Sequence, residues 1–414
     1  MKFFFPDSQD QIDPSFDFET EGRTRLRLRH REDLYAHEAF SKAPFDGVLV
    51  SKAVLQAGRY SLAQKQRMMR SGVREFFRIS DPNLLTMGDC GAFAYVREEK
   101  PPYSVEEVVD YYQAMGFDFG MSVDHIIFGY DPTETRVNPD WHDRQELTTS
   151  LAKDFMREHL RSGSRFTPIG VAQGWSPRSY AHAVQELQNI GYTYIALGGM
   201  VGLRTRDILT CLSAIREILR AGVRLHILGV TRLDSMQDFA DLGVASIDST
   251  SPLRQAFKDE RDNYHTEDRT YTAIRVPQVD ANPQLLRKIK SGKVNQGEAR
   301  RLERNCLLRL NEFERGECSV SQALEAILDY EALYSVGRSF ENAYREVLAD
   351  TPWKRCPCDI CKSIGIHAIV FRGAERNRRR GFHNLYIFYQ KLQAKRVPQP
   401  ALITALEQEE VATA

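Results

Sequence analysis

The sequence predicts an α/β protein: a (β/α)₈ TIM barrel with a helical insertion and a small C-terminal subdomain that binds structural zinc. Three observations lead to this fold class. Eight short apolar segments recur between residues 45 and 249, helical segments alternate with them, and no Gly-x-Gly-x-x-Gly turn follows an early strand. The missing turn disfavours the alternative, an open doubly wound sheet that binds a dinucleotide. Alternating strands and helices in this number favour a closed barrel.

The eight predicted strands are rich in apolar and β-branched residues and often end in Gly or an acid. Several are apolar on both faces, which is typical of parallel strands that are covered on both sides. The predicted strands are residues 45–51, 74–80, 83–89, 118–124, 166–174, 192–199, 224–230 and 244–249.

Helical segments lie between these strands. Residues 103–116, 176–191 and 205–222 each carry a Ser or Thr near the start and a glycine at the end. A hydroxyl side chain caps the first turn of a helix, and glycine accepts the left-handed conformation that ends one. The connection over residues 125–165 is long enough for a loop and a further helix.

Four regions follow from this pattern. Residues 1–255 are expected to form the catalytic barrel, and residues 256–350 a charged, mostly helical insertion. Residues 351–395 are expected to form the zinc-binding subdomain and a closing helix, whose apolar run at 385–389 faces the core. Residues 396–414 form a polar tail.

Composition excludes several classes of protein. The chain has 414 residues and a net charge of zero, so any nucleic-acid surface must be a local patch. Seven cysteines, an odd number over a long chain, do not form a disulfide framework and indicate a reducing compartment. No secretion signal or membrane-spanning run is visible, so we expect a soluble cytoplasmic protein with no membrane partner.

Polar residues stand where the predicted strands end. The carboxyl ends of barrel strands meet at one mouth, which would bring Asp89, Asp124, Gln173 and Asp248 together. A single Asp at a strand end is often only a helix cap or turn residue. Three carboxylates in one pocket repel one another, however, and raise each other's pKa, which favours a functional reason for the cluster.

These residue types suit one kind of chemistry. Two carboxylates can cleave a glycosidic bond with retention, when one attacks the anomeric carbon and the other protonates the leaving group. A third carboxylate can accept the N1–H and N2–H₂ donors of a guanine, while Gln173 donates to O6. Phe93, beside the pocket, could stack on the base.

Cys356, Cys358 and Cys361 form a C-x-C-x-x-C motif followed by a histidine, either His367 or His383. Three thiolates and one imidazole make a complete tetrahedral zinc set with no open position, which indicates a structural site. A redox centre is disfavoured because no thioredoxin-type C-x-x-C precedes a βαβ unit. His226 lies inside a predicted strand and is expected to be packed rather than catalytic.

Six pieces of the chain, in order, resemble the tRNA-guanine transglycosylases and their DNA-acting relatives. Together they extend from Asp89 to about Tyr389, and the helical insertion between them does not match. The pieces are DCGAFAY at 89–95, SVD at 122–124, GVAQG at 170–174, ALGGM at 196–200, LGV at 228–230 with IDSTSPLR at 247–254, and CPCDIC at 356–361 with HN at 383–384.

The resemblance implies a zinc-bearing barrel that exchanges guanine for a 7-deazaguanine base. It implies that Asp248 is the nucleophile and Asp89 the general acid/base, and that no ATP is needed because the glycosyl-enzyme conserves the bond energy. It selects His383 as the fourth metal ligand. The base-binding residues that it implies are Asp124, Gln173, Gly198, Gly199, Met200 and Leu228, with Phe93 stacking on the base.

Departures from the family pattern point to the DNA branch. The tRNA enzymes follow their nucleophile with a glycine-arginine run, of which only Arg254 survives here, and their opening segment is missing. The chain therefore resembles the enzymes that place 7-cyano-7-deazaguanine (preQ0) into DNA. The alternatives are a tRNA-guanine transglycosylase, a catalytically silent nucleic-acid-binding subunit, and a barrel hydrolase of small metabolites, which leaves the Cys/His motif unexplained.

A guanine in duplex DNA must be flipped out to reach a pocket, so contacts to the DNA backbone are required. The run Arg23 to Arg31 could bind phosphates, but alternating Arg and Leu suits an exposed edge strand equally well. An accessory protein and a homodimer formed through the zinc-side surface are further expected partners. The other candidates for phosphate contacts are Arg254, Arg372, Arg376, Arg378, Arg379 and Arg380.

Overall fold

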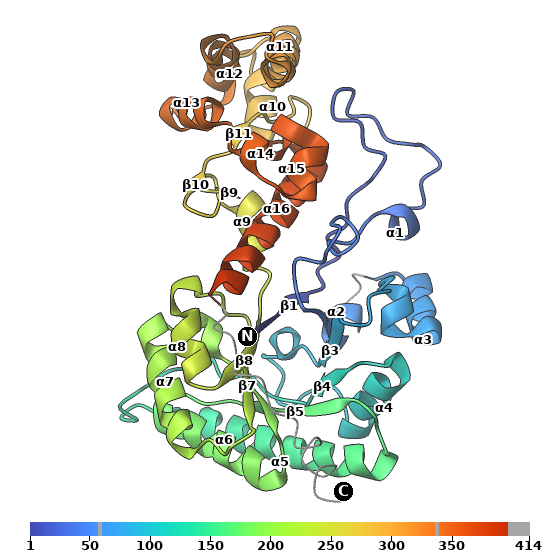
Figure 1. Cartoon of the computed structure of the whole chain (residues 1–414), viewed down its shortest axis with the longest axis vertical. Helices are drawn as coiled ribbons and strands as arrows, with labels where there is room; N and C mark the ends of the chain where they lie inside the picture. Colours follow the sequence, from blue (N-terminus) through green and yellow to red (C-terminus); the bar gives the residue numbers. More distant parts are fainter. Residues whose placement is uncertain (57–59, 336–338, 396–414) are drawn as a thin grey trace, which may run out of the picture.

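The structure is a computed structural model that describes residues 1–56, 60–335 and 339–395; the expected tail at 396–414 lies outside them. Figure 1 shows a barrel below an elongated second body, with α16 running between the two. No helix in the described part of the chain has the length and apolar character that crossing a membrane requires.

Eight parallel strands close into the predicted barrel. Each strand pairs with the next one along the chain, and β8 pairs with β1 to close the ring. The strands are β1 (Lys2–Pro6), β2 (Gly47–Ser51), β3 (Leu85–Asp89), β4 (Phe119–Met121), β5 (Thr167–Ala172), β6 (Tyr194–Leu197), β7 (Arg224–Ile227) and β8 (Val244–Asp248).

Helices cover the outside of the ring, and several use the predicted caps. The Ser104 side chain accepts from the first turn of α4, and left-handed Gly116 ends that helix. The helices and 3₁₀ turns of this part are α1 (Arg29–Glu32), α2 (Lys52–Gln56), α3 (Leu62–Phe76), η1 (Ala92–Ala94), α4 (Val105–Met115), α5 (Pro139–Ser162), α6 (Pro177–Ile190), η2 (Met200–Gly202), α7 (Thr205–Ile218), η3 (Leu233–Ser235), α8 (Met236–Asp241) and α9 (Ser251–Lys258).

One predicted strand is wrong. Residues 74–76 end α3, where the buried Val73 and Phe76 lie three residues apart on one helix face, and residues 77–80 form no strand. The eighth strand is β1, which the sequence analysis did not identify. Phe4 of β1 belongs to the packed interior of the barrel, whereas Phe3 packs outward against Phe388 of α16. The other seven predicted segments each contain a strand.

The barrel interior is a packed core rather than a channel. Apolar side chains from six strands form one buried cluster below the mouth, as is usual for this architecture. The cluster consists of Phe4, Leu49, Met87, Met121, Ile169, Val171, Tyr194 and Ala196.

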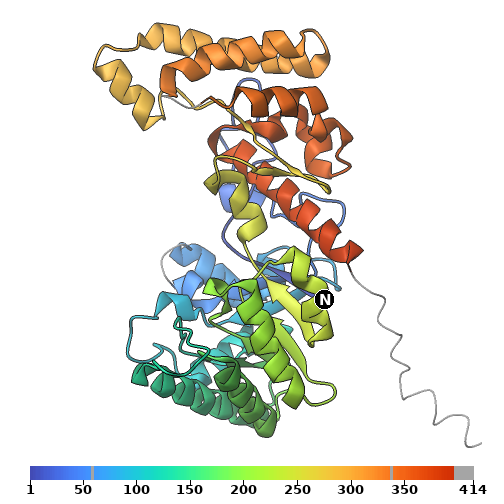
Figure 2. The ribbon, with the colours of Figure 1, turned by 90° about the vertical axis from the view of Figure 1, so that its left-hand side faces the viewer.

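The second body follows α9. The region predicted to be a charged helical insertion supplies helices that stack at the end far from the barrel (Figure 2). From there the chain returns through α16, which packs along α9. The elements are β9 (Tyr264–His265), β10 (Thr270–Tyr271), β11 (Ile274–Arg275), α10 (Pro283–Lys290), α11 (Gln296–Arg315), α12 (Val320–Tyr334), α13 (Glu341–Asp350), α14 (Pro352–Arg355), α15 (Asp359–Ile364), η4 (Gly365–Ile369), β12 (Val370–Phe371) and α16 (Gly373–Ala394).

Residues 7–45, which we call the arm, connect β1 to β2 outside the barrel. They leave the barrel and run beside α16 before they return to β2 (Figure 1). The arm holds little regular structure apart from α1.

Candidate active site and metal centre

The polar residues predicted at the strand ends line one cavity of about 840 Å³. Asp89 ends β3 and Asp248 ends β8, while Asp124 and Gln173 follow β4 and β5. Met200, expected in the base pocket, is fully buried and does not line the cavity. The other predicted residues along the cavity wall are Phe93, Gly198, Gly199, Leu228 and Arg254.

The pKa of Asp89 lies near neutral pH, where a carboxyl group can transfer a proton. Burial and then the nearby charge of Asp124 raise the pKa of Asp89 from 3.8 to about 7, against the opposing hydrogen bond from the Gly91 N–H. A carboxyl group that titrates near neutral pH can both donate and accept a proton under working conditions. A pKa in this range is compatible with the general acid/base role that the resemblance implied for Asp89.

Asp124 is fixed on both of its oxygens. Gln173 Nε2 donates to Asp124 Oδ2 at 2.7 Å, and the Cys90 thiol donates to Oδ1 at 3.2 Å. Tyr95 supports this pair, because its hydroxyl lies 3.1 Å from Cys90 Sγ. Burial raises the pKa of Asp124, although the hydrogen bonds from Cys90 and Gln173 oppose the rise. Cys90 and Tyr95 were not identified as site residues from the sequence.

Gln173 and the two glycines that follow β6 approach one another closely. A Cβ on Gly198 would lie 2.1 Å from Gln173 Nε2, so no larger residue fits there without moving the amide. Gly199 adopts a φ of +73°, and a Cβ on it would lie 2.5 Å from the Ile127 carbonyl oxygen. The Ile127 N–H donates to Gln173 Oε1 at 3.2 Å, which leaves the Gln173 amide fixed in orientation.

Asp248 is held by a chain of hydrogen bonds that the sequence analysis missed. Its Oδ1 accepts from the Gly229 N–H at 3.0 Å and lies 3.1 Å from His226 Nε2. His226 Nδ1 lies 2.6 Å from Ser246 Oγ, which in turn contacts the Tyr194 hydroxyl.

The direction of this chain follows from its donors. If Tyr194 donates to Ser246 and Ser246 to Nδ1, the N–H of His226 lies at Nε2, where it donates to Asp248. His226 is fully buried, as expected, but it contacts a predicted catalytic carboxylate. The alternation of side chains along strands could have revealed this contact. His226 pairs with Ser246 in register, and Asp248 lies two residues after Ser246 on the same face of the sheet.

Two exposed phenylalanines stand at the mouth. Phe93 lines the cavity with 59% of its surface exposed, and its ring centroid lies 5.5 Å from that of Phe128. Phe128 is 57% exposed. An aromatic pair at a rim can stack on a planar base.

The arginines of α16 and of its N-cap, Arg372, do not fit their predicted role as phosphate contacts. Arg372, Arg376, Arg379 and Arg380 are at most 5% exposed, and their guanidinium groups bind acids and carbonyl oxygens of the protein itself. Arg378 is half-buried and donates to the Gln11 carbonyl oxygen at 3.0 Å. Internal pairing explains the disagreement, since a buried, satisfied guanidinium cannot reach a phosphate. Arg254 is half-buried and lines the cavity.

The Cys/His motif gathers into one cluster. The ligand atoms of Cys356, Cys358, Cys361 and His383 all lie within 4.8 Å of one another. His383 Nδ1 lies 3.3 to 3.5 Å from the three sulfurs. Tetrahedral zinc with ordinary Zn–S and Zn–N bonds requires about 3.6 Å between these atoms, so the set fits zinc. His367 is not part of the cluster and stacks on Phe18 at 4.9 Å.

The surroundings of His383 prepare it for a metal. Its Nε2 lies 2.7 Å from the His265 carbonyl oxygen, an acceptor that places the ring proton on Nε2 and turns Nδ1 toward the sulfurs. Tyr264 stacks on the imidazole at 4.1 Å, and its hydroxyl lies 3.2 Å from Cys361 Sγ. The cluster joins α15 to the middle of α16 and lies away from the barrel mouth, as a structural centre does.

Comparisons with known proteins agree with this geometry. A family model described as queuine tRNA-ribosyltransferase matches residues 54–273. A curated protein of Salmonella montevideo named DNA-guanine transglycosylase is 50% identical over 406 residues, which cover 95% of this chain and 97% of that protein.

Proposed function

The chain belongs to the queuine tRNA-ribosyltransferase family, and from this premise we propose that it exchanges guanine in DNA for a 7-deazaguanine base such as preQ0. Membership makes it a glycosyl-transferring enzyme. The DNA substrate is proposed because the Salmonella relative, similar over nearly the whole of both chains, carries that activity in its name. Free cysteines at all seven positions support a reducing, cytoplasmic setting.

In the first half-reaction, Asp248 attacks C1′ of the target nucleotide. The bond from C1′ to the guanine N9 breaks, a bond from C1′ to the Asp248 carboxylate oxygen forms, and Asp89 supplies a proton to the departing base. In the second half-reaction, Asp89 takes the N9 proton from the incoming base. That base then attacks C1′ and releases Asp248, so the exchange needs no ATP.

The Asp124–Gln173 pair is proposed to select the base. Asp124 has lone pairs left for the N1–H and N2–H₂ donors that guanine and preQ0 share, and Gln173 Nε2 has a second N–H for O6. Glycine at 198 and 199 keeps a Cβ away from the Gln173 amide and the Ile127 carbonyl oxygen, so that the amide can stay aimed at the base. Phe93 and Leu228 line the cavity beside this pair, where they can cover the base.

One observation carries the proposal: Asp89 and Asp248 face the same cavity with the Asp124–Gln173 pair beside them. A hydrolase of small metabolites would have no use for a guanine-edge reader, and a silent binding subunit would have no use for a positioned nucleophile. The Cys₃His cluster is proposed to hold structural zinc, which takes no part in the steps above.

The test is incorporation of labelled preQ0 by the purified protein into DNA or tRNA. Label is expected in DNA, without ATP, and none is expected with Asp248→Ala. A covalent protein–DNA adduct should be trapped with the natural protein and absent from the variant. Label in tRNA alone would refute the DNA substrate. No label in either polymer, even after a cell extract supplies an accessory protein, would refute the activity.

A further inference from the structure

The buried arginines of α16 hold the arm in place. Arg372 pairs with Glu21 and with Glu303 of α11, each at 2.6 Å, and Arg376 also pairs with Glu21. Arg376 Nη2 donates to the Phe18 carbonyl oxygen at 2.7 Å. The cationic segment that the sequence offered as a DNA surface therefore binds the outermost part of the arm.

A second set of contacts anchors the following stretch of the arm. Glu375 of α16 accepts from the Asp13 N–H at 3.0 Å and pairs with Arg23 at 3.1 Å. Arg27 is 6% exposed at its side chain and pairs with two acids of the arm, Asp13 and, at 3.3 Å, Asp33. Arg23 and Arg27 are thus bound within the protein at both sides of Arg25.

The arginines between and after these anchors point outward. We call residues 23–31 the arginine loop. Arg25, Arg29 and Arg31 are exposed, and no acid pairs with them in the part of the chain that the structure describes. Leu26 is 90% exposed and Leu28 is 57% exposed beside them. The alternating pattern is therefore not an edge strand, because these residues form no strand and end in α1.

The anchoring of a loop with unpaired cations affects both the stability of the folded protein and the free energy of binding a polyanion. Like charges held close together destabilise the folded state, and the anchors prevent the loop from spreading them apart. The same anchoring lowers the entropy lost on binding a polyanion, which makes each phosphate contact more favourable. Phosphates of a nucleic acid satisfy several guanidinium groups at the spacing of a backbone.

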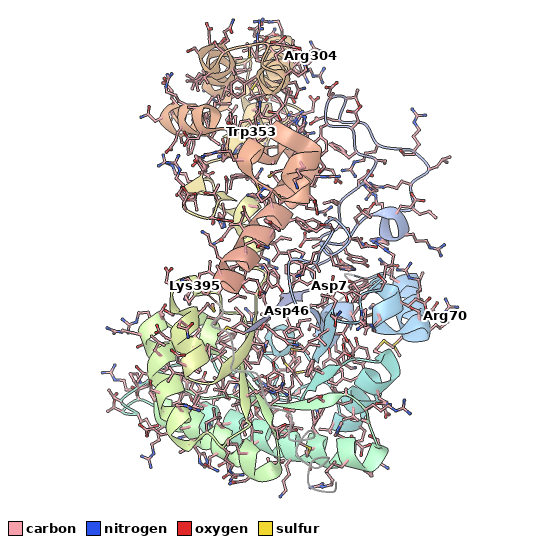
Figure 3. All side chains as sticks on the ribbon, viewed as in Figure 1. Asp7, Asp46, Arg70, Arg304, Trp353 and Lys395 are labelled. Atoms are coloured by element: carbon pink, nitrogen blue, oxygen red, sulfur yellow. The ribbon has the colours of Figure 1, made fainter. Side chains whose placement is uncertain are left out.

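The arm that carries the loop begins at the catalytic cavity. Ser8 lines the cavity, and Asp13, which pairs with Arg27, is five residues further along the chain. Five extended residues span at most about 17 Å. That length equals about five nucleotides along one strand, at 3.4 Å each. Figure 3 labels Asp7, at which the arm leaves the barrel, and Asp46, at which the chain has returned to it.

We propose that the arginine loop is a DNA-backbone contact, in which Arg25, Arg29 and Arg31 bind phosphates beside the target guanine and the α16 arginines act as its internal anchor. The proposal deepens the proposed function and rests on DNA being the substrate. Of the two arginine runs that the sequence offered for phosphate contacts, it assigns the role to the exposed one in the arm and not to the buried one at α16.

The test compares two triple variants of the whole protein with equal loss of charge. One is R25A/R29A/R31A. The control is R157A/R161A/R216A, which removes exposed arginines near the C-terminal ends of α5 and α7, at the end of the barrel opposite its mouth. Binding to a short labelled duplex, and to its target strand alone, is measured at several salt concentrations, together with thermal stability.

The loop variant should bind DNA roughly 10- to 100-fold more weakly, and its plot of log K against log salt should be shallower by about 2 to 3. The control should match the natural protein in both quantities. At saturating DNA the loop variant should keep its kcat and its KM for preQ0, because the loop does not touch the base pocket.

Unchanged DNA affinity and salt slope in a folded loop variant would overturn the inference, as would weakened binding of tRNA alone. These outcomes differ from failure of the proposed function. In that case the natural protein would incorporate no label into DNA, whatever the loop variant does to binding.

Discussion

At the scale of single residues, the site depends on how burial and hydrogen bonds set two carboxylates to different tasks. Asp89, with its pKa at about 7, can move a proton. Asp248, the proposed nucleophile, is instead held in place, because its Oδ1 accepts from the Gly229 N–H and lies 3.1 Å from His226 Nε2. The two half-reactions need this division of labour.

The raised pKa of Asp89 predicts a specific effect on stability. Between about pH 4 and pH 7 the folded protein binds a proton at Asp89 that the unfolded chain releases, so stability falls as pH rises through this range. Asp89→Asn removes that loss. The Tm of the variant relative to the natural protein should therefore be higher at pH 8 than at pH 4, while base exchange is abolished. Equal Tm differences at both pH values would contradict the raised pKa.

His226 is predicted to position the nucleophile rather than to bind substrate. His226→Leu should lower kcat roughly 10- to 100-fold, since a carboxylate displaced by even 1 Å attacks poorly, and should leave the KM for DNA and for base unchanged. His226→Gln, which can place an N–H near the same point, should recover much of the loss. Rates of covalent adduct formation measure the effect directly. A change confined to KM, or equal losses in both variants, would argue against positioning.

Gly198 is predicted to be limited to glycine by the Gln173 amide. Gly198→Ala should raise the KM for preQ0 roughly 10- to 100-fold, because the new methyl group displaces the amide from the base edge. Gly202→Ala is the matched control, since a Cβ there meets nothing within 4 Å. Similar kinetics for the two variants would show that the close approach has no effect on base binding.

At the scale of elements, the metal cluster is predicted to stabilise the junction of α15 with α16. Cys361→Ala should abolish binding of about one zinc per chain and lower Tm by roughly 10 °C. Cys318→Ala, at a half-buried cysteine outside the cluster, should keep both the metal and most of the stability. Metal analysis and thermal unfolding decide the matter. Loss of metal with unchanged Tm and activity would refute a structural role.

Elements were predictable where the local sequence decides them. The strands with apolar faces and polar ends were found, as were the helices with Ser and Gly caps. β1 was missed because the arm, rather than a long helical segment, follows it, whereas the predicted strands were recognised by the helical segments that alternate with them. Residues 74–80 were misassigned because two adjacent phenylalanines suit a strand as well as a helix end.

Site residues were likewise predictable where the local sequence decides them and were missed where distant partners decide them. Asp89, Asp124 and Gln173 stand in recognisable local motifs at strand ends. His226, Cys90 and the internal role of the α16 arginines depend instead on partners far along the chain, such as Glu21 for Arg372, 351 residues away. A cationic run alone does not reveal whether its charges face solvent or acids.

At the scale of the whole molecule, α16 connects three functions. Its first turns hold the arm and thereby the arginine loop, its middle supplies His383 to the metal cluster, and its later residues pack on β1 through Phe388. Loss of the metal is therefore expected to weaken DNA binding through the arm, as well as stability. Salt-dependent DNA binding of Cys361→Ala tests this link, with Cys318→Ala as the control, and unchanged affinity in a folded, metal-free protein would contradict it.

The pairing of β1 with β8 also has a consequence during synthesis. Phe4 lies in register with Asp248, about 240 residues later in the chain. At ordinary rates of translation, the first strand waits roughly 12 to 50 seconds before its second neighbour leaves the ribosome. During that time β1 can pair only with β2, so the nascent chain exposes the other, unpaired edge of β1, which is prone to aggregation. Asp248, the proposed nucleophile, gains its neighbour Phe4 only when this first-made strand and the last-made strand of the barrel meet.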